Sequence, residues 1–229
     1  MDFLTQSAYF GAALSLAAYG AGTLLHRRFR HTLVNPLLIS VILCIAVLAL
    51  TGVSYETYDA GAKYLSWFLT PATVCLAVPL YEKLALLREN RAAVLLGILS
   101  GVLTTLLCVL AMALLFRLPH RDYVTLLPKS VTTAIGMGIS EELGGHVTLT
   151  AAIIIITGLI GNIFAPLVCR LCRIDEPIAR GVAIGSSAHG IGTARAMEMG
   201  SVVGAMSGLS IAVSGLLTVV LAPLFARLL

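Results

Sequence analysis

The sequence predicts an all-α, polytopic membrane protein, and two observations carry that prediction. Of its 229 residues, 59% are hydrophobic and only 11% are charged, with a mean hydropathy of +0.98. A soluble domain carries about 25% charged residues, so this chain could not cover a soluble core with polar surface. Its apolar residues also form long unbroken runs, unlike the short alternating strands of a membrane barrel. We therefore expect a single integral membrane domain over residues 1–229.

Spanning helices of a bilayer need about 20 largely apolar residues. Five segments meet this requirement, and a sixth is shorter and carries Pro71 and Pro79. In chain order they are Leu4–Leu25, Leu33–Gly52, the shorter Tyr64–Tyr81, Ala92–Phe116, Val147–Val168 and Ser201–Ala226. We expect residues 1–60 to form a scaffold of N-terminal spans and residues 61–229 to form repeat units.

Basic residues are concentrated in three short clusters between apolar runs, so the net charge of +4 is not the footprint of a nucleic-acid-binding protein. The clusters are His26–His31, Lys83 with Arg88 and Arg91, and Arg170 with Arg173 and Arg180. Loops rich in Lys and Arg face the cytoplasm. The pattern places these three loops inside and the N-terminus outside.

Two polar segments do not fit a simple count of crossings. The second and third basic clusters require an even number of crossings between them, and Ala92–Phe116 with Val147–Val168 already supplies two. The polar segment Tyr123–Gly145 is therefore expected to be re-entrant or broken, and Gly181–Gly200 resembles it in polarity. The alternative is that both segments cross as shielded, broken helices, which would raise the count from six spans to eight.

An internal repeat links these segments. Ser100-Gly101, Thr157-Gly158 and Ser214-Gly215 recur at a constant offset, since 157 − 100 = 57 and 214 − 157 = 57. The same offset upstream relates Pro71, Pro128 and Gly185, which lie within interrupted segments at 64–81, 123–145 and 181–200. Each unit is thus an interrupted segment followed by a smooth apolar helix. Chance similarity among small residues is the alternative, but paired interrupted segments point to the binding site of a transporter.

The stretch that begins at Pro128 contains the first candidate site. Lys129 is flanked by apolar residues, and a lysine at membrane depth is expected to face a cavity. Its ammonium suits a carboxylate or phosphate, and the hydroxyls of Ser130, Thr132 and Thr133 could hydrogen-bond the same solute. The alternative is that Lys129 extends to the membrane interface with a solvated head.

The stretch Gly185–Arg195 is the second candidate. Helix breaks are expected at Gly185, Gly190 and Gly192, because glycine permits unwound backbone with free amide donors. His189 could donate to a carboxylate or carry a proton, and Arg195 could bind a carboxylate with two hydrogen bonds. The neighbouring hydroxyls of Ser187 and Thr193 complete this candidate site. The alternatives are a neutral, internally bonded His189 and an Arg195–Glu198 ion pair.

A third stretch offers an uncharged part of the same site. Helix breaks are expected at Pro71 and Pro79, with Thr73 and backbone carbonyls available to a ligand. The alternative is a kinked span. Walker A, GxGxxG-helix, HExxH and GxSxG motifs do not occur, so neither an enzyme activity nor a cofactor is expected. Cys169 and Cys172 form a lone CxxC, which predicts free thiols and no metal site.

At these motifs the sequence resembles the LrgB/CidB family of bacterial inner-membrane proteins. The resemblance rests on Asn35-Pro36-Leu37-Leu38, on Pro71–Tyr81, on Leu127–Thr133, and on Pro177-Ile178-Ala179-Arg180-Gly181 running into Gly185–Arg195. It implies two functions. One is antiholin-like regulation of murein hydrolase export and cell lysis with a small LrgA/CidA-type partner. The other is transport of small organic acids such as pyruvate, since the plastid glycolate/glycerate translocator is similar to a fusion of the two partners.

The polar interrupted segments favour transport. A pore that lyses cells has little need for Lys129, His189 and Arg195 among broken helices, whereas a carrier of small anions needs such groups. We therefore expect a carrier of small monocarboxylates that works by an elevator or rocking motion of the interrupted segments. The scaffold is expected to form a homodimer in the bacterial inner membrane.

Overall fold

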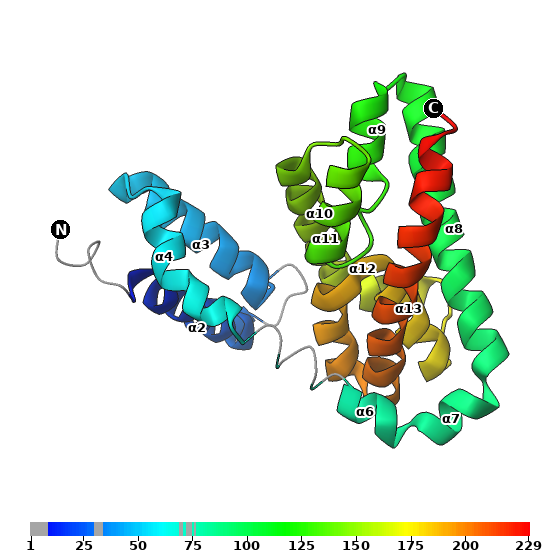
Figure 1. The fold of residues 1–229 in the computed structure, drawn as a ribbon. Helices are drawn as coiled ribbons and strands as arrows, with labels where there is room; N and C mark the ends of the chain where they lie inside the picture. The colour runs from blue at the N-terminus through cyan, green and yellow to red at the C-terminus, as the bar shows by residue number, and fades with distance from the viewer. Residues whose placement is uncertain (1–8, 30–33, 69–70, 72–74, 76) are drawn as a thin grey trace. The chain divides into compact units, whose positions relative to one another are not determined.

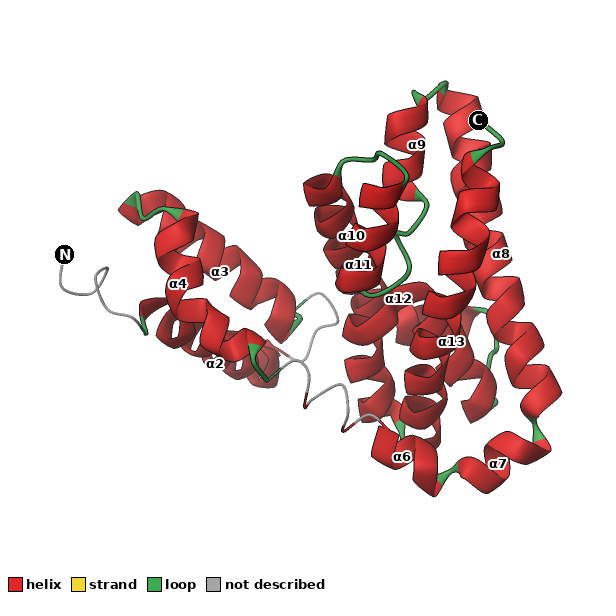
Figure 2. Ribbon diagram, in the orientation of Figure 1, coloured by secondary structure: helices red, strands yellow, loops and turns green. Residues whose placement is uncertain are grey.

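The computed structural model describes residues 9–29, 34–68, 71, 75 and 77–229. In this described part every regular element is helical (Figure 2), as the sequence predicts. The residues form two compact units, Met1–Cys75 and Leu76–Leu229. Each unit is described by itself below.

The first unit contains α2 (Phe10–Phe29), α3 (Pro36–Thr51) and α4 (Tyr55–Ser66). Asn35 begins α3, since its Oδ1 accepts hydrogen bonds from the backbone N–H groups of Leu37 and Leu38 at 2.9 and 3.2 Å. Gly52 ends α3 in the left-handed conformation, with φ of +68°. The helices α2 and α3 thus cover most of the first two predicted spans.

Helix α4 follows α3 after a short connection. Ser54 begins it, because its Oγ accepts the backbone N–H of Thr57 at 3.3 Å. Tyr58 anchors it to α2 through a hydrogen bond of 2.7 Å between its hydroxyl and Ser15 Oγ. The close approach requires Gly11, since a Cβ there would overlap the main chain at Tyr58.

The second unit carries the long apolar helices. Its elements are α6 (Ala77–Glu82), α7 (Leu84–Glu89), α8 (Arg91–Phe116), α9 (His120–Leu126), α10 (Thr133–Glu142), α11 (Val147–Leu171), α12 (Pro177–Met199) and α13 (Ser201–Ala226) (Figure 1). Within the described ranges, α8, α11 and α13 are the helices long and apolar enough to cross a membrane. They coincide with the last three predicted spans. The total of six or eight spans stays a prediction.

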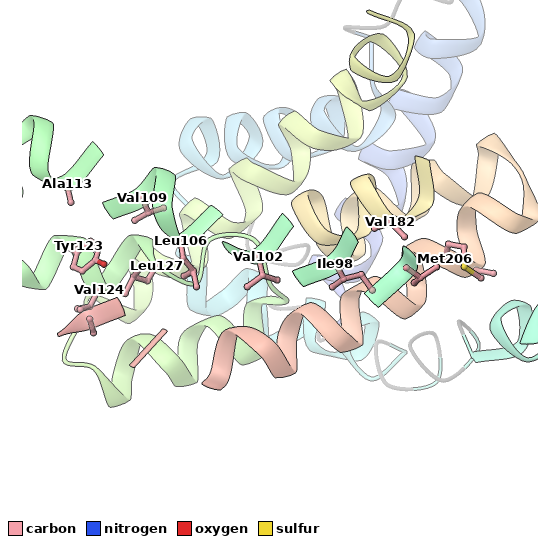
Figure 3. Close-up of a cluster of buried hydrophobic side chains, with 13 residues drawn as sticks. Ile98, Val102, Leu106, Val109, Ala113, Tyr123, Val124, Leu127, Val182 and Met206 are labelled. Carbon is pink, nitrogen blue, oxygen red and sulfur yellow. The ribbon is translucent and has the colours of Figure 1, made fainter. Parts of the chain in front are cut away.

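A continuous apolar core joins α8 to α9 and α13. Ile98, Val102, Leu106 and Val109 recur every three or four residues, so they share one buried face of α8 (Figure 3). Tyr123 of α9 packs into the same cluster and donates a hydrogen bond from its hydroxyl to the carbonyl of Phe225 at 2.9 Å. The beginning of α9 and the end of α13 therefore lie at the same end of the unit (Figure 1).

The interrupted segment predicted at Tyr123–Gly145 is a hairpin formed by α9 and α10, which together cover residues 120–142. Asp122 near its start lies 3.8 Å from His146 just after its end, measured between Oδ1 and Nε2. Thr150 ties both arms together, since its hydroxyl contacts the carbonyl of Thr125 at 3.0 Å and Ser140 Oγ at 2.7 Å. The chain therefore returns to the end of the unit at which it entered, and its re-entrant path in a membrane stays a prediction.

The second interrupted segment is α12, which breaks at His189. Its backbone there has φ of 42° and ψ of −140°, far from helical values. The residues of α13 that contact α12 show that the chain reverses its direction at this break. Before the break, Gly181 faces Val203 and Met206, and Gly185 faces Ser207 and Ser210. After the break the order runs backwards, since Thr193 contacts Ser207 and Met197 contacts Gly204. The two arms of α12 therefore also form a hairpin.

The sequence placed the break of α12 at its glycines, and this needs correction. Gly185, Gly190 and Gly192 lie in helical backbone, and His189 alone departs from it. Gly185 serves close packing instead, because a Cβ there would lie 2.8 Å from the Cα of Ser207. Gly190 borders open space, and Gly192 lies against Ala188. Gly185 and Gly192 therefore permit tight packing rather than unwinding of the helix.

Two of the three predicted units, those with interrupted segments at 123–145 and 181–200, recur in the structure at the offset of 57 residues. The first arms begin at His120 and Pro177, and 177 − 120 = 57. The breaks fall at Thr132 and His189, and the second arms end at Glu142 and Met199, at the same offset. Each repeat combines a returning hairpin with one long helix. Successive repeats must therefore point in opposite directions, so the two hairpins enter from opposite ends of the unit.

Candidate functional site

The tips of the two hairpins approach one another around a small enclosed cavity, here called the central cavity. Its volume is about 10 Å³, which is room for roughly one water molecule. Its polar lining consists of hydroxyls: Thr105 of α8, Ser130 at the first tip, Ser186 before the second tip, and Ser214 and Thr218 of α13. Residues from both repeats and from α8 therefore meet at this point.

Three of these hydroxyls donate their protons to main-chain carbonyls, which leaves their oxygens as hydrogen-bond acceptors. Ser186 donates its proton to the carbonyl of Val182 at 2.7 Å, and Thr218 donates to the carbonyl of Ser214 at 2.7 Å. Ser214 in turn donates to Ile211 at 3.2 Å. A hydroxyl has one proton to donate and two lone pairs to accept with. The cavity therefore offers acceptors to a small hydrogen-bond donor such as water.

Lys129 lies at the first tip beside this cavity. Its Nζ donates to Ser130 Oγ at 3.0 Å. Within the described ranges, no carboxylate lies within ion-pair distance of it. A charged group inside an apolar bundle is costly unless it has a partner of opposite charge. The arrangement therefore leaves an ammonium ready to bind an anion.

The start of α10 adds a second attraction for anions at the first tip. Thr132 begins α10, and its side chain makes no capping hydrogen bond. The first N–H groups of a helix have no partner within it and carry a partial positive charge. Thr133 is the first residue of α10 and, like Thr132, is partly buried. Thr132 and Thr133 follow Lys129 within four residues, and their place in one site with Lys129 stays a prediction.

His189 forms the second tip and is only 3% exposed. Its Nε2 lies 2.9 Å from the carbonyl oxygen of Ile154 on α11. A carbonyl can only accept, so Nε2 carries the proton. Gly158 makes room for the ring, since a Cβ there would lie 2.7 Å from the imidazole. A positive φ at a residue other than glycine costs about 1–3 kcal/mol and is typical of functional sites.

Thr193 fastens the second tip to α13. Its hydroxyl donates to the carbonyl of His189 at 2.9 Å and lies 2.7 Å from Ser207 Oγ. Thr193 and Ser207 are fully buried. Since the hydroxyl of Thr193 is engaged within the hairpin, it holds His189 in place rather than reaching toward the central cavity.

The remaining predicted site residues lie apart from the central cavity. Arg195 pairs with Glu198 through Nη1 and Oε2 at 2.5 Å, which is the alternative that the sequence left open. Ser187 is exposed and donates to the carbonyl of Ala183 at 2.6 Å. Pro79 falls in the first turn of α6, where proline is tolerated. Pro71 is exposed, and Thr73 lies outside the described residues.

Sequence reasoning missed the hydroxyls that the long helices contribute. Thr105, Ser186, Ser214 and Thr218 line the central cavity, yet none was proposed as a site residue. A signal was present in α13, where small hydroxyl residues recur along one face at helical spacing. The stripe comprises Ser207, Ser210, Ser214 and Thr218, all buried.

A larger groove, here called the α8–α12 groove, lies between α8 and the first arm of α12. Its volume is about 600 Å³, and it extends from Asn90 and Glu176 at the surface to Thr105 and Ser186 inside. Arg91 and Arg180 belong to the basic clusters at the ends of the same two helices. The outer end of the groove therefore lies at the end of the unit that the positive charges assign to the cytoplasm.

The chain is similar to known proteins over nearly its whole length. The profile of the LrgB-like family matches residues 15–228. The antiholin-like protein LrgB of Bacillus cereus (strain B4264) is 36% identical over 225 residues, with 96% of each chain covered. The antiholin-like protein LrgB of Bacillus anthracis (strain CDC 684 / NRRL 3495) shows the same identity and coverage. No solved structure matches the chain.

Proposed function

This chain belongs to the LrgB-like family, and we propose that it is a membrane carrier of small organic acids such as pyruvate, glycolate or related monocarboxylates. The observation that carries the proposal is Lys129, a lysine held by Ser130 at the tip of a re-entrant hairpin without a carboxylate partner among the described residues. Three long apolar helices around it fit a membrane protein.

The proposed binding groups surround the two tips. Lys129 supplies the charge for the carboxylate, and Ser130 with the free N–H groups after Thr132 supplies hydrogen bonds. His189 lies at the opposite tip, where Thr193 holds its backbone. Half-helices that begin at membrane depth and point their N-termini at an anion are a recurring device of carriers.

The oppositely directed hairpins supply a mechanism for alternating access. A solute between two hairpin tips can be released to one side or the other, according to which hairpin moves away. We propose an elevator or rocking motion of the two repeats against a scaffold that includes the N-terminal helices. A homodimer formed through that scaffold, in the bacterial inner membrane, is part of the proposal.

The test is uptake of labelled pyruvate, glycolate and lactate into liposomes that contain the purified protein. We expect saturable uptake that the other small acids inhibit, and that Lys129→Met greatly reduces. Unchanged uptake in Lys129→Met and His189→Ala would show that the binding site is assigned to the wrong residues. Lack of saturable uptake for every small acid would contradict the proposal that the protein is a carrier.

A second candidate function follows from the names of the relatives. They are called antiholin-like proteins, and the same role here would be regulation of murein hydrolase export and lysis with an LrgA/CidA-type partner. This role predicts release of large dyes from liposomes, or control of that release, when the partner is present. Saturable uptake by this chain without its partner, and without dye release, would favour the carrier.

A further inference from the structure

The α8–α12 groove lies outside the binding groups proposed above but borders on them. Thr105 and Ser186 line both the groove and the central cavity. On its far side the central cavity is bounded by Ser130, the hydroxyl that holds Lys129. One layer of side chains therefore separates the groove from the proposed anion site.

The groove is large enough for a small solute and offers it a few hydroxyls within a lining of small residues. Its volume of about 600 Å³ lies in the range of ligand sites. Small and hydroxyl-bearing residues dominate: Ala93, Gly97, Ser100, Gly101 and Thr104 of α8, with Ala179, Ala183 and Ser187 of α12. Glu176 is its charged lining residue among those described, and this carboxylate caps α12 by accepting the N–H of Ile178.

The inner end of the groove is closed by a contact between α8 and α12. Gly101 faces Ser186 so closely that a Cβ on Gly101 would lie 2.8 Å from Ser186 Oγ. One turn earlier, a Cβ on Gly97 would lie 3.2 Å from Val182. A passage to the central cavity therefore requires the first arm of α12 to move away from α8.

We propose that the α8–α12 groove is the cytoplasmic vestibule for the organic acid and that the Gly101–Ser186 contact is its gate. The inference rests on the proposed carrier function. The first arm of α12 ends at the non-helical His189, so this arm can tilt while Thr193 and Ser207 keep the second arm on α13. The tilt separates Ser186 from Gly101 and joins the groove to the central cavity.

The gate is tested by adding one methyl group and then making room for it. Gly101→Ala should reduce uptake by at least about tenfold, because the added methyl group overpacks the contact and hinders closure of the gate. Adding Ser186→Gly should restore most of the uptake, because it removes the side chain that the methyl group meets. Gly138→Ala is the matched control, since a Cβ there has open space. Normal uptake by Gly101→Ala would overturn the gate.

The vestibule is tested by cysteine accessibility in a protein without native cysteines. Ala183→Cys lies in the groove and should react with a charged, membrane-impermeant thiol reagent from the cytoplasmic side only. Reaction should block uptake, and saturating pyruvate should slow the reaction several-fold. Ala111→Cys, on an exposed face of α8 away from the groove, is the control and should not react.

The outcomes separate this inference from the carrier function. If the unaltered protein takes up acid while Ala183→Cys is unreactive, or reacts without effect on uptake, the vestibule is wrong and the carrier stands. If the unaltered protein shows no saturable uptake, the carrier function fails and the vestibule falls with it.

Discussion

His189 and Ile154 join the second hairpin tip to α11 through a hydrogen bond of 2.9 Å between Nε2 and the main-chain carbonyl. The side chain of the same Ile154 packs against Gly136 in the first turn of α10. Ile154 therefore contacts both hairpins, with its main chain on one tip and its side chain on the other. A displacement of either tip therefore changes a contact of Ile154.

Replacing His189 should separate two roles of this residue. In His189→Ala the carbonyl of Ile154 loses its donor while the backbone strain remains, so stability should fall by about 1–3 kcal/mol. In His189→Gly the same bond is lost, but glycine adopts a positive φ without strain and should recover part of that loss. Thermal unfolding in detergent measures the difference, and uptake should fall in both variants. Equal stability of the two would contradict the strained backbone.

Gly158→Ala should displace the imidazole directly. A Cβ at Gly158 would lie 2.7 Å from the His189 ring, which its hydrogen bond to the carbonyl of Ile154 holds in place. We expect a loss of about 1–3 kcal/mol in stability together with reduced uptake. Gly20→Ala is the matched control, because it is also helical but faces open space. That control should be neutral or slightly stabilising.

The sequence was sufficient to predict the long helices and the two interrupted segments. The spans predicted at Ala92–Phe116, Val147–Val168 and Ser201–Ala226 match α8, α11 and α13 within a few residues, because long apolar runs have one stable solution in a bilayer. The prediction for Tyr123–Gly145 rested on its polarity and on the parity of crossings that the Lys and Arg clusters set, whereas the prediction for Gly181–Gly200 rested on its polarity.

The site was harder to predict, because it depends on which small residues face one another. Ser186 and Ser214 are ordinary small residues in apolar helices, and only the packing of these helices shows that their hydroxyls line one cavity. Arg195 carries a charge that suggested a ligand, but its position after the break brings it to Glu198. The break fell at His189 rather than at the neighbouring glycines, because tertiary contacts of the imidazole outweigh local backbone preference.

Lys129→Met should raise the substrate concentration needed for half-maximal uptake by at least about tenfold. The change keeps the length and apolar stem of the side chain and removes its charge, and a charge-assisted hydrogen bond contributes about 1.5–3 kcal/mol. Stability should hold or rise, because the charge has no carboxylate partner among the described residues. Lys63→Met, at an exposed lysine of α4, is the control. Equal loss of uptake in both variants would argue against a specific role for Lys129.

Thr150→Val should loosen the first hairpin without touching the proposed binding groups. Its hydroxyl bridges the carbonyl of Thr125 and Ser140 Oγ, and valine of similar shape removes both contacts in a fully buried position. Stability should fall by about 1–3 kcal/mol. Hydrogen exchange should increase in α9 and α10 more than in α12. Thr148→Val, an exposed position on the same helix, should change neither. Uniform exchange throughout the protein would show that the hairpin does not move as a unit.

Arg195→Ala tests whether the charge of the second hairpin takes part in binding. The guanidinium pairs with Glu198 one turn along the helix, and both side chains are partly exposed. Such a pair contributes no more than about 1 kcal/mol, so stability should change little. Uptake should fall far less than in Lys129→Met, because Arg195 already has a carboxylate partner in Glu198 whereas Lys129 has none among the described residues. Charge reversal in Arg195→Glu with Glu198→Arg should preserve the pair and serve as the control. If Arg195→Ala abolishes uptake and the reversed pair fails to restore it, Arg195 must leave Glu198 during transport and bind the acid itself.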